Sequence, residues 1–304
     1  MVSRTLLGTY RNLHLVNGVS LLAIGTESYG TWAYNLARSL RFFCPDIPIQ
    51  LVYEESAVKH VDKSVFDILT PMHRDHSHRG GRLNPSFAKL SMFQYYPGTW
   101  DKVMFLDVDT LALADFSDLF EMDSPFKIHT WATTDQKEGV FGNMLWMKIE
   151  DMRRIFGLPT QTIPGTNSSF QVMELGQYAE SIYEDALAAY YLFESEFSSR
   201  DLYMHWGRKT RGAILPDELF FNVALAKKEG YDGWKPILFH TNADGDLRPM
   251  DEYVKEGKRF IGYWGDKGYN STKSRLTYDL LAKKYTGQRQ KVDRLLGQKF
   301  VNFN

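Results

Sequence analysis

The sequence predicts an α/β fold in which helices flank a mostly parallel central sheet. Apolar runs of strand length at 19–26, 47–55 and 102–106 alternate with segments whose apolar residues recur at helical spacing. No internal repeat and no low-complexity linker interrupts this alternation. Such alternation is typical of parallel sheets, whose ligands bind beyond the carboxyl ends of the strands.

The first part of the chain is predicted to form a strand, a helix and a second strand. The run VSLLAIGT at 19–26 indicates a buried strand. In the segment 31–42, apolar residues recur every four positions, which places them on one face of a helix. The run at 47–55 gives the second strand, and a polar loop that contains glycine follows at 73–82.

The next predicted element is a helix with a favoured start. Asn84 is a good N-cap and Pro85 a good first helical residue, so we expect a helix from there to Tyr96. The remaining elements follow in chain order: strands at 102–106, 126–133, 168–175 and 235–240, helices at 143–156, 177–194 and 216–228, and a basic helix at 276–297.

The composition is that of an ordinary globular protein. The 304 residues are 43% hydrophobic and 24% charged, and the net charge of -1 gives no overall attraction to nucleic acid or membrane. The single cysteine excludes an internal disulfide and fits a reducing compartment. No apolar run of about 18 residues predicts a transmembrane helix, and no secretory leader is recognisable. We therefore expect a cytoplasmic protein.

Two aspartates stand at the end of the apolar strand at 102–106. Asp107 and Asp109 are two residues apart, so in an extended chain both side chains project to one side while Val108 turns back into the protein. Two carboxylates this close repel each other unless a cation lies between them or one is protonated. A hard divalent cation, manganese or magnesium, is the natural partner for these oxygens.

Two other interpretations of the aspartate pair stay open at this point. Asp109 could begin an ordinary turn while Asp107 caps a neighbouring group. Alternatively, phosphatases of the haloacid-dehalogenase type carry Asp-x-Asp-x-Thr after an apolar strand, and their first aspartate accepts the phosphoryl group. Here Thr110 comes one residue early, and about a hundred residues precede a motif that normally opens the chain.

The segment around these aspartates resembles a known family. A Lys-Leu pair at 89–90 precedes the strand, Asp-Val-Asp-Thr-Leu follows at 107–111, and Asp-Leu-Phe comes at 118–120. In order and spacing this resembles nucleotide-sugar glycosyltransferases of the GT-A fold, most of all family 8, the glycogenin and galactinol synthase group. The resemblance implies a Rossmann-like sheet and a retaining transferase, for hexose or pentose, with a uridine-linked donor.

The resemblance also implies a donor site. In the family, a tyrosine after the first strand packs on the base, and an Asn-Ser-Gly strand holds sugar hydroxyls. The donor-binding residues implied here are Gly25, Thr26, Tyr29, Lys89, Asp107, Val108, Asn167, Ser168, Ser169, Gly245 and Arg248. Lys89 would place a positive charge beside the diphosphate, and Arg248 would bind it bidentately. Ser169 stands where the family has glycine, which leaves the sugar less room.

Catalytic and metal-binding residues follow from the same resemblance. Asp217 matches the aspartate of the family's Asp-Gln-x-x-x-Asn helix, and Glu218 replaces its glutamine, so these two are the catalytic candidates. Alternatively, both acids simply stabilise the positive start of a helix. Asp107, Asp109 and His240 are the implied ligands of Mn²⁺ or Mg²⁺, which would neutralise the leaving diphosphate.

The sequence suggests a glycosyltransferase domain at 1–250 and a basic helical extension at 251–304. From Lys273 to the end there are eight Lys or Arg against two Asp. Such a run is more often a solvated face, but it could also contact a polyanion or a membrane surface. The acceptor stays open between a glycan, a lipid-linked group and nucleic acid carrying a modified base.

Overall fold

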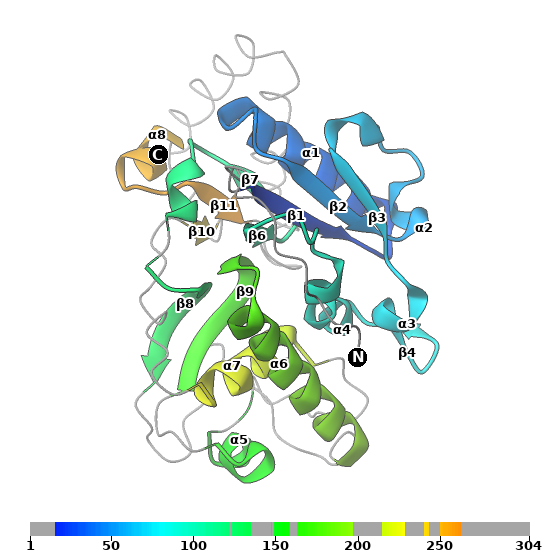
Figure 1. The fold of residues 1–304 in the computed structure, drawn as a ribbon, viewed down its shortest axis with the longest axis vertical. Helices are drawn as coiled ribbons and strands as arrows, with labels where there is room; N and C mark the ends of the chain where they lie inside the picture. The colour runs from blue at the N-terminus through cyan, green and yellow to red at the C-terminus, as the bar shows by residue number, and fades with distance from the viewer. Residues whose placement is uncertain are drawn as a thin grey trace, which may run out of the picture.

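A six-stranded sheet in the order β3-β2-β1-β6-β9-β8 forms the centre of the protein (Figure 1). In chain order its strands are β1 (Asn17–Ala23), β2 (Ile49–Tyr53), β3 (Ile68–Pro71), β6 (Lys102–Leu106), β8 (Phe126–Thr134) and β9 (Ile163–Glu174). Strands β1, β2, β3 and β6 are parallel, whereas β9 is antiparallel to both β6 and β8. The predicted α/β fold with a mostly parallel sheet is confirmed.

The structure is a computed structural model. It describes residues 16–121, 123–134, 147, 149–158, 163–196, 215–228, 240–242 and 250–262. Within these residues, no helix is both long and apolar enough to cross a membrane.

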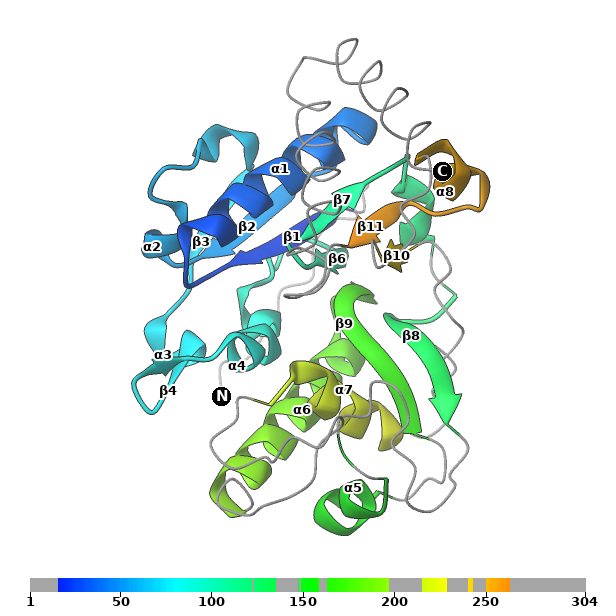
Figure 2. The same ribbon diagram turned by 180° about the vertical axis from the view of Figure 1, so that it is seen from behind.

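Helices cover both faces of the sheet (Figures 1 and 2). Alternate strand residues enter two separate cores: Leu22 and Phe105 lie in one, Leu21 and Met104 in the other. Helix α1 (Glu27–Phe43) packs in the second core. The first core contains α4 (Pro85–Leu90), α6 (Gln177–Glu196) and α7 (Asp217–Ala226). Because both faces are buried, the strands have nearly continuous apolar sequences.

Two small sheets and several short helices complete the described fold. Strands β10 (His240–Asn242), β11 (Phe260–Gly262) and β7 (Thr110–Ala112) form one sheet, and β4 (His78–Arg79) pairs with β5 (Arg82–Leu83) in the other. The short helices are α2 (Glu55–Val58), α3 (Arg74–Ser77), α5 (Ile149–Phe156), α8 (Met250–Lys255) and the 3₁₀ turns η1 (Lys63–Val65), η2 (Met92–Tyr95) and η3 (Ser117–Phe120).

The C-terminal part of the described chain is joined to this framework. Strand β11 is antiparallel to β7, which directly follows Asp109. Residues 250–262 therefore contribute a helix and a strand next to the predicted site. The rest of the predicted extension, with the basic helix at 276–297, lies outside the described residues.

The predicted helix from Pro85 to Tyr96 is wrong in its second half, because α4 ends at Leu90 and the turn η2 follows. The hydroxyl of Ser91 donates a hydrogen bond of 3.0 Å to the carbonyl oxygen of Phe87, which competes with continued helical bonding. Tyr96 is extended, as expected for a residue before proline.

Other predicted boundaries also shift. Strand β9 begins at Ile163 instead of 168, and helix α5 spans Ile149–Phe156, whereas the predicted helix start at 143 lies outside the described residues. The polar first half of β9 can belong to a buried strand because its groups are paired. The backbone N–H and hydroxyl of Thr166 donate to Oδ1 of Asn222 at 2.9 and 2.6 Å. Of the predicted strand at 235–240 the described residues include only His240, which begins β10.

His129 in β8 makes stability depend on pH. Burial, and secondly the positive charge of Lys258, lower the pKa of His129 to about 4 from its ordinary 6.5. Between these values the unfolded chain binds a proton that the folded protein excludes. The stability that depends on the neutral imidazole is therefore complete above pH 6.5 and is lost as the pH falls toward 4, by about 3 kcal/mol.

We expect urea unfolding to show this loss in the wild type and not in His129→Asn, which has no imidazole to titrate. Asp109 and Glu218, whose pKa values are raised, also change protonation between the folded and unfolded states. The difference between the two pH profiles therefore isolates His129. Parallel profiles would show that the imidazole is not held neutral by the fold.

Candidate active site

Asp107 and Asp109 lie where β6 ends, at the edge of the sheet that also holds the carboxyl ends of β1, β2 and β3. The backbone N–H of Asp107 donates to the carbonyl oxygen of Ser169 at 2.9 Å. The chain then turns, since the N–H of Thr110 donates to the carbonyl oxygen of Asp107 at 3.2 Å. Both aspartates are half-buried, and Val108 between them is buried in the core beneath α1.

Lys89 on α4 joins this pair to residues far along the chain. Its Nζ lies 2.8 and 2.9 Å from the two carboxylate oxygens of Asp107. It also donates to Oγ of Ser168 at 3.1 Å and lies 3.3 Å from Oδ2 of Asp217. The hydroxyl of Ser168 in turn donates to Asp217. An ammonium, a hydroxyl and two carboxylates therefore form one network from α4, β6, β9 and α7.

The charges of this network determine its protonation. Burial lowers the pKa of Lys89, but the carboxylates of Asp107, Asp217 and Glu218 outweigh that effect and raise it above its ordinary value. The ammonium therefore stays charged. Burial raises the pKa of Asp107 although Lys89 opposes the shift. The ammonium of Lys89 thus lies among the carboxyl groups of Asp107, Asp217 and Glu218.

Asp109 and Glu218 are the two acids that most favour a proton. Burial, and then the charge of Asp107, raise the pKa of Asp109 to about 7. Burial, and then the charge of Asp217, raise the pKa of Glu218 to about 8. Burial is the main cause of both shifts, and the neighbouring carboxylates add to it although Lys89 opposes them. A ligand that brings positive charge would bind here favourably.

The aspartate pair fits a hard divalent cation. Oδ1 of Asp109 is buried and has no hydrogen-bond partner among the described residues. A buried oxygen of this kind is costly unless a ligand completes it, and carboxylate oxygens are the ligands that Mg²⁺ and Mn²⁺ prefer. In the described part of the chain no group of three or more His, Cys, Asp or Glu side chains could hold a metal.

The predicted third ligand, His240, is described only in its backbone. It begins β10, which pairs with β11, and β11 pairs with β7 directly after Asp109. At about 4.8 Å between neighbouring strands, its backbone lies on the order of 10 Å from that of Ala112. Gly245 and Arg248 lie outside the described residues.

The polar run at 167–169 is brought to the site but is internally bonded. Oδ1 of Asn167 accepts hydrogen bonds from both the backbone N–H, at 2.8 Å, and the hydroxyl of Ser169. Ser168 is fully buried between Lys89 and Asp217. Ser168 therefore belongs to the network around Lys89, whereas the side chains of Asn167 and Ser169 bond to each other.

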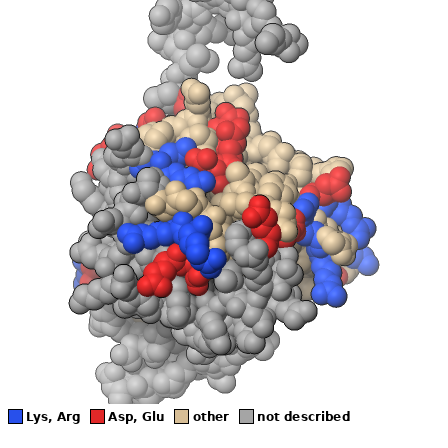
Figure 3. Space-filling model, turned by 90° about the horizontal axis from the view of Figure 1, so that it is seen from below, with Lys and Arg blue, Asp and Glu red and all other residues tan. Residues whose placement is uncertain are grey.

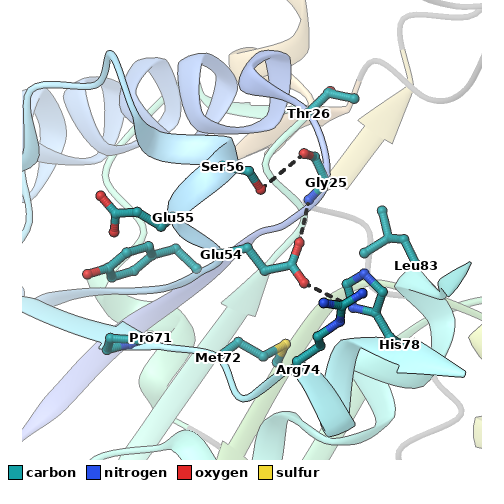
Figure 4. Close-up of a pocket in the computed structure, with 11 residues that line it drawn as sticks. Gly25, Thr26, Glu54, Glu55, Ser56, Pro71, Met72, Arg74, His78 and Leu83 are labelled. Carbon is teal, nitrogen blue, oxygen red and sulfur yellow. Dashed lines mark hydrogen bonds and ion pairs between the residues drawn. The ribbon is translucent and has the colours of Figure 1, made fainter. Parts of the chain in front are cut away.

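A cavity of about 670 Å³ opens at the same sheet edge (Figure 4). Its lining comes from the ends of β1, β2 and β3, from the starts of α2 and α3 and from the hairpin β4–β5: Gly25, Thr26, Tyr53, Glu54, Glu55, Ser56, Pro71, Met72, Arg74, His78 and Leu83. The volume is within the range of about 300–1,000 Å³ common for small-molecule sites. Of the predicted donor residues, Gly25 and Thr26 line it.

Glu54 holds three walls of this cavity together. Its Oε2 accepts a hydrogen bond of 3.1 Å from the backbone N–H of Gly25, and its Oε1 accepts one from the hydroxyl of Ser77. Nδ1 of His78 lies 3.3 Å from the same Oε1. Gly25 has φ +88°, and a Cβ there would lie 2.6 Å from Leu83, so only glycine fits this turn.

The sequence interpretation did not name Glu54, Arg74 or His78 as donor-binding residues. One signal was available, because Glu54 directly follows the apolar strand β2 as Asp107 follows β6. Tyr29, predicted to pack on a base, is not among the residues that line the cavity. Its ring lies 5.2 Å from that of Trp32 on the same helix.

Positive charge gathers beside the cavity. Figure 3 shows Lys and Arg side chains at the right of the view, on the side where α3 and the β4–β5 hairpin lie in Figure 1. Arg74 and Arg82 in this segment are exposed, whereas Arg79 is ion-paired with Glu194. Only Arg74 of these also lines the cavity.

Comparison with solved structures identifies the fold. The bifunctional glycosyltransferase WbbM matches with a TM-score of 0.54 and 11% identity over 92% of this chain, which spans 52% of the WbbM chain. The galactosyltransferase LgtC, solved with donor and acceptor sugar analogues, matches with a TM-score of 0.53 and 13% identity over 87% of this chain and 95% of LgtC. An active-site variant of LgtC matches similarly, with a TM-score of 0.51.

These likenesses show the fold, and the chain therefore has the GT-A glycosyltransferase fold that the sequence predicts. No protein-family model matches the sequence, and the comparison with curated proteins found no match.

Proposed function

We propose that this protein is a metal-dependent glycosyltransferase that moves a sugar from a uridine diphosphate sugar to a saccharide acceptor. The observation that carries the proposal is the aspartate pair at the carboxyl edge of the sheet, with a buried oxygen of Asp109 that lacks a partner among the described residues. The GT-A fold supports it, since WbbM and LgtC are glycosyltransferases.

The cavity is where we propose that the nucleoside binds. Strand β1 lies between β2 and β6, so the cavity at the ends of β1–β3 is one to three strand spacings, about 5–15 Å, from the aspartates after β6. A base and ribose in the cavity would place the diphosphate at Asp107 and Asp109. The two features at one sheet edge thus match the two halves of one donor.

The residues divide the chemistry of transfer between them. A divalent cation held by Asp107 and Asp109 would supply Lewis-acid neutralisation of the diphosphate. Asp217 and Glu218 begin α7, whose positive end also faces developing negative charge. We propose that Asp217 binds the sugar or stabilises positive charge at its anomeric carbon. Ser168 is fully buried between Lys89 and Asp217 and would exclude water from this part of the site.

The direction of attack and the acceptor belong to the same proposal. We propose retention of the anomeric configuration, with the leaving phosphate taking the acceptor proton. We favour a saccharide acceptor because LgtC was solved with an acceptor sugar analogue. Nucleic acid would instead meet the cations of the β4–β5 hairpin, and a phosphatase would use Asp107 as nucleophile.

The test is a screen of nucleotide sugars with manganese. We expect a uridine diphosphate sugar with manganese to raise the unfolding temperature, because a ligand at 100 times its Kd adds about 2.7 kcal/mol to stability. We also expect slow release of uridine diphosphate that a saccharide acceptor accelerates. Release of inorganic phosphate from phosphate esters, with no effect of nucleotide sugars, would support the phosphatase and reject transfer.

Arg74 tests the assignment of the cavity to the nucleoside. Its guanidinium lines the cavity and is exposed, without an ion pair among the described residues. We expect Arg74→Met to weaken the binding of uridine diphosphate by about tenfold, because a charge-assisted hydrogen bond is worth roughly 1.5–3 kcal/mol. Calorimetric titration with saturating manganese measures this.

Arg82→Met is the matched control, because Arg82 is an exposed arginine of the same segment that does not line the cavity. Its affinity for uridine diphosphate should equal that of the wild type. If Arg74→Met and Arg82→Met bound uridine diphosphate equally well, the assignment of this cavity to the nucleoside would be rejected. The metal assignment would not be affected.

A further inference from the structure

Lys89 is buried at the point where four elements meet. Its side chain is 11% exposed, and the contacts of its ammonium come from β6, β9 and α7 in addition to its own helix α4. Asp107 and Asp217 are 110 residues apart in sequence, yet one Nζ lies within 3.3 Å of both. The ammonium is thus the direct link between the metal-binding edge and the start of α7.

The hydrogen-bonding capacity of this ammonium is already filled. A lysine has three N–H donors, and three different side chains accept or pair with them: Asp107 at 2.8 Å, Ser168 at 3.1 Å and Asp217 at 3.3 Å. The hydroxyl of Ser168 bonds on to Asp217, which closes the network. No donor of Lys89 is left over for an incoming diphosphate.

We propose that Lys89 is a positioning residue that fixes Asp107 and Asp217 relative to each other and does not itself bind the donor's diphosphate. The proposal rests on the proposed function, since it assigns Asp107 to the metal and diphosphate and Asp217 to the sugar. It differs from the role that family resemblance implies for this lysine, which is a direct contact with the donor.

The physical reason is the repulsion between two buried acids. Asp217 has a side chain only 10% exposed, and Asp107 one 30% exposed. Without a cation between them, two such carboxylates move apart or one takes up a proton, and either response misplaces a group that must meet the donor. Misplacement by a single ångström is enough to lower a rate by about 100-fold.

The test separates the binding of the diphosphate from turnover. At saturating manganese the cation would hold Asp107, so Asp217 is the acid that loses its partner in Lys89→Met. We therefore expect this variant to change the affinity for uridine diphosphate by less than about threefold and to lower kcat with the sugar nucleotide about 100-fold. Lys89→Arg should recover at least about tenfold of that loss, because a guanidinium can bridge two carboxylates. A loss of diphosphate affinity as large as the loss in kcat would overturn the proposal.

A double variant keeps the test decisive if Lys89→Met folds poorly. Lys89→Met with Asp217→Asn removes both charges of the pair, so no uncompensated partner is left at Asp217. If Lys89 acts through Asp217, the double variant has the kcat of Asp217→Asn alone to within about threefold. Independent, multiplicative losses would reject the positioning role.

A failure of the proposal for Lys89 can be told apart from a failure of the proposed function. If the wild type binds no uridine diphosphate in the presence of manganese, the function itself is wrong. If the wild type binds and turns over the donor, the comparison of the Lys89 and Asp217 variants with the wild type tests the role of Lys89 alone. Thermal unfolding of every variant, without ligand, shows whether each is folded at the assay temperature.

Discussion

Asp109→Asn is expected to lower turnover of the sugar nucleotide at least about 100-fold. The amide keeps the size of the side chain but removes the negative charge that would hold the divalent cation beside the diphosphate. Oδ1 of Asp109 is buried without a hydrogen-bond partner among the described residues, so the native carboxylate is arranged for a ligand and not for the fold. Release of uridine diphosphate with manganese measures the effect.

The same variant should not lose folding stability. Burial and the charge of Asp107 raise the pKa of Asp109 to about 7, which means that its charged form is unfavourable in the protein without metal. A neutral amide relieves that cost. We therefore expect the unfolding temperature without manganese to be equal to or above that of the wild type, and the increase on adding manganese to disappear.

Asp118→Asn is the control for this change. Asp118 follows in the same segment, and among the described residues its exposed carboxylate has only a long contact of 3.5 Å to Arg259. Its activity and its response to manganese should match those of the wild type. Full activity of Asp109→Asn would refute the metal assignment, whatever the control shows.

The neighbouring acids of α7 are expected to behave in opposite ways. Asp217→Asn should lower kcat by at least about 100-fold, because it removes the charge that Lys89 and Ser168 hold in place. Glu218→Gln should stay within about threefold of the wild type at neutral pH. Burial and Asp217 raise the pKa of Glu218 to about 8, so its side chain is mostly a neutral acid there and a neutral amide resembles it.

The pH profile gives the second half of this prediction. An acid with a raised pKa is protonated below that value and loses the proton as the pH rises through it. We expect wild-type kcat to fall as the pH passes about 8, when Glu218 becomes charged beside Asp217. In Glu218→Gln that fall should be absent. A variant that is inactive at neutral pH would show that the carboxylate charge itself is required.

Much of the fold was predictable because its signals are local. The strand at 102–106 is found with the predicted bounds, since β6 is buried on both faces and therefore continuously apolar. The start of α4 follows from Asn84 and Pro85, and Oδ1 of Asn84 accepts from the N–H of Phe87 as an N-cap should. The end of that helix was not predicted, because the competing hydroxyl of Ser91 is only a weak local signal.

The sequence alone determined that two carboxylates follow a buried strand, because the continuous apolar run before them is a property of neighbouring residues. Tertiary structure alone decided what surrounds them. It brought Lys89 between Asp107 and Asp217, joined Glu54 to Gly25 and Ser77, and set the pKa values of Asp109 and Glu218. Burial and charge–charge contact depend on distance in space. Contacts between residues far apart in the chain produce no periodic pattern in the sequence, so they could not be predicted from it.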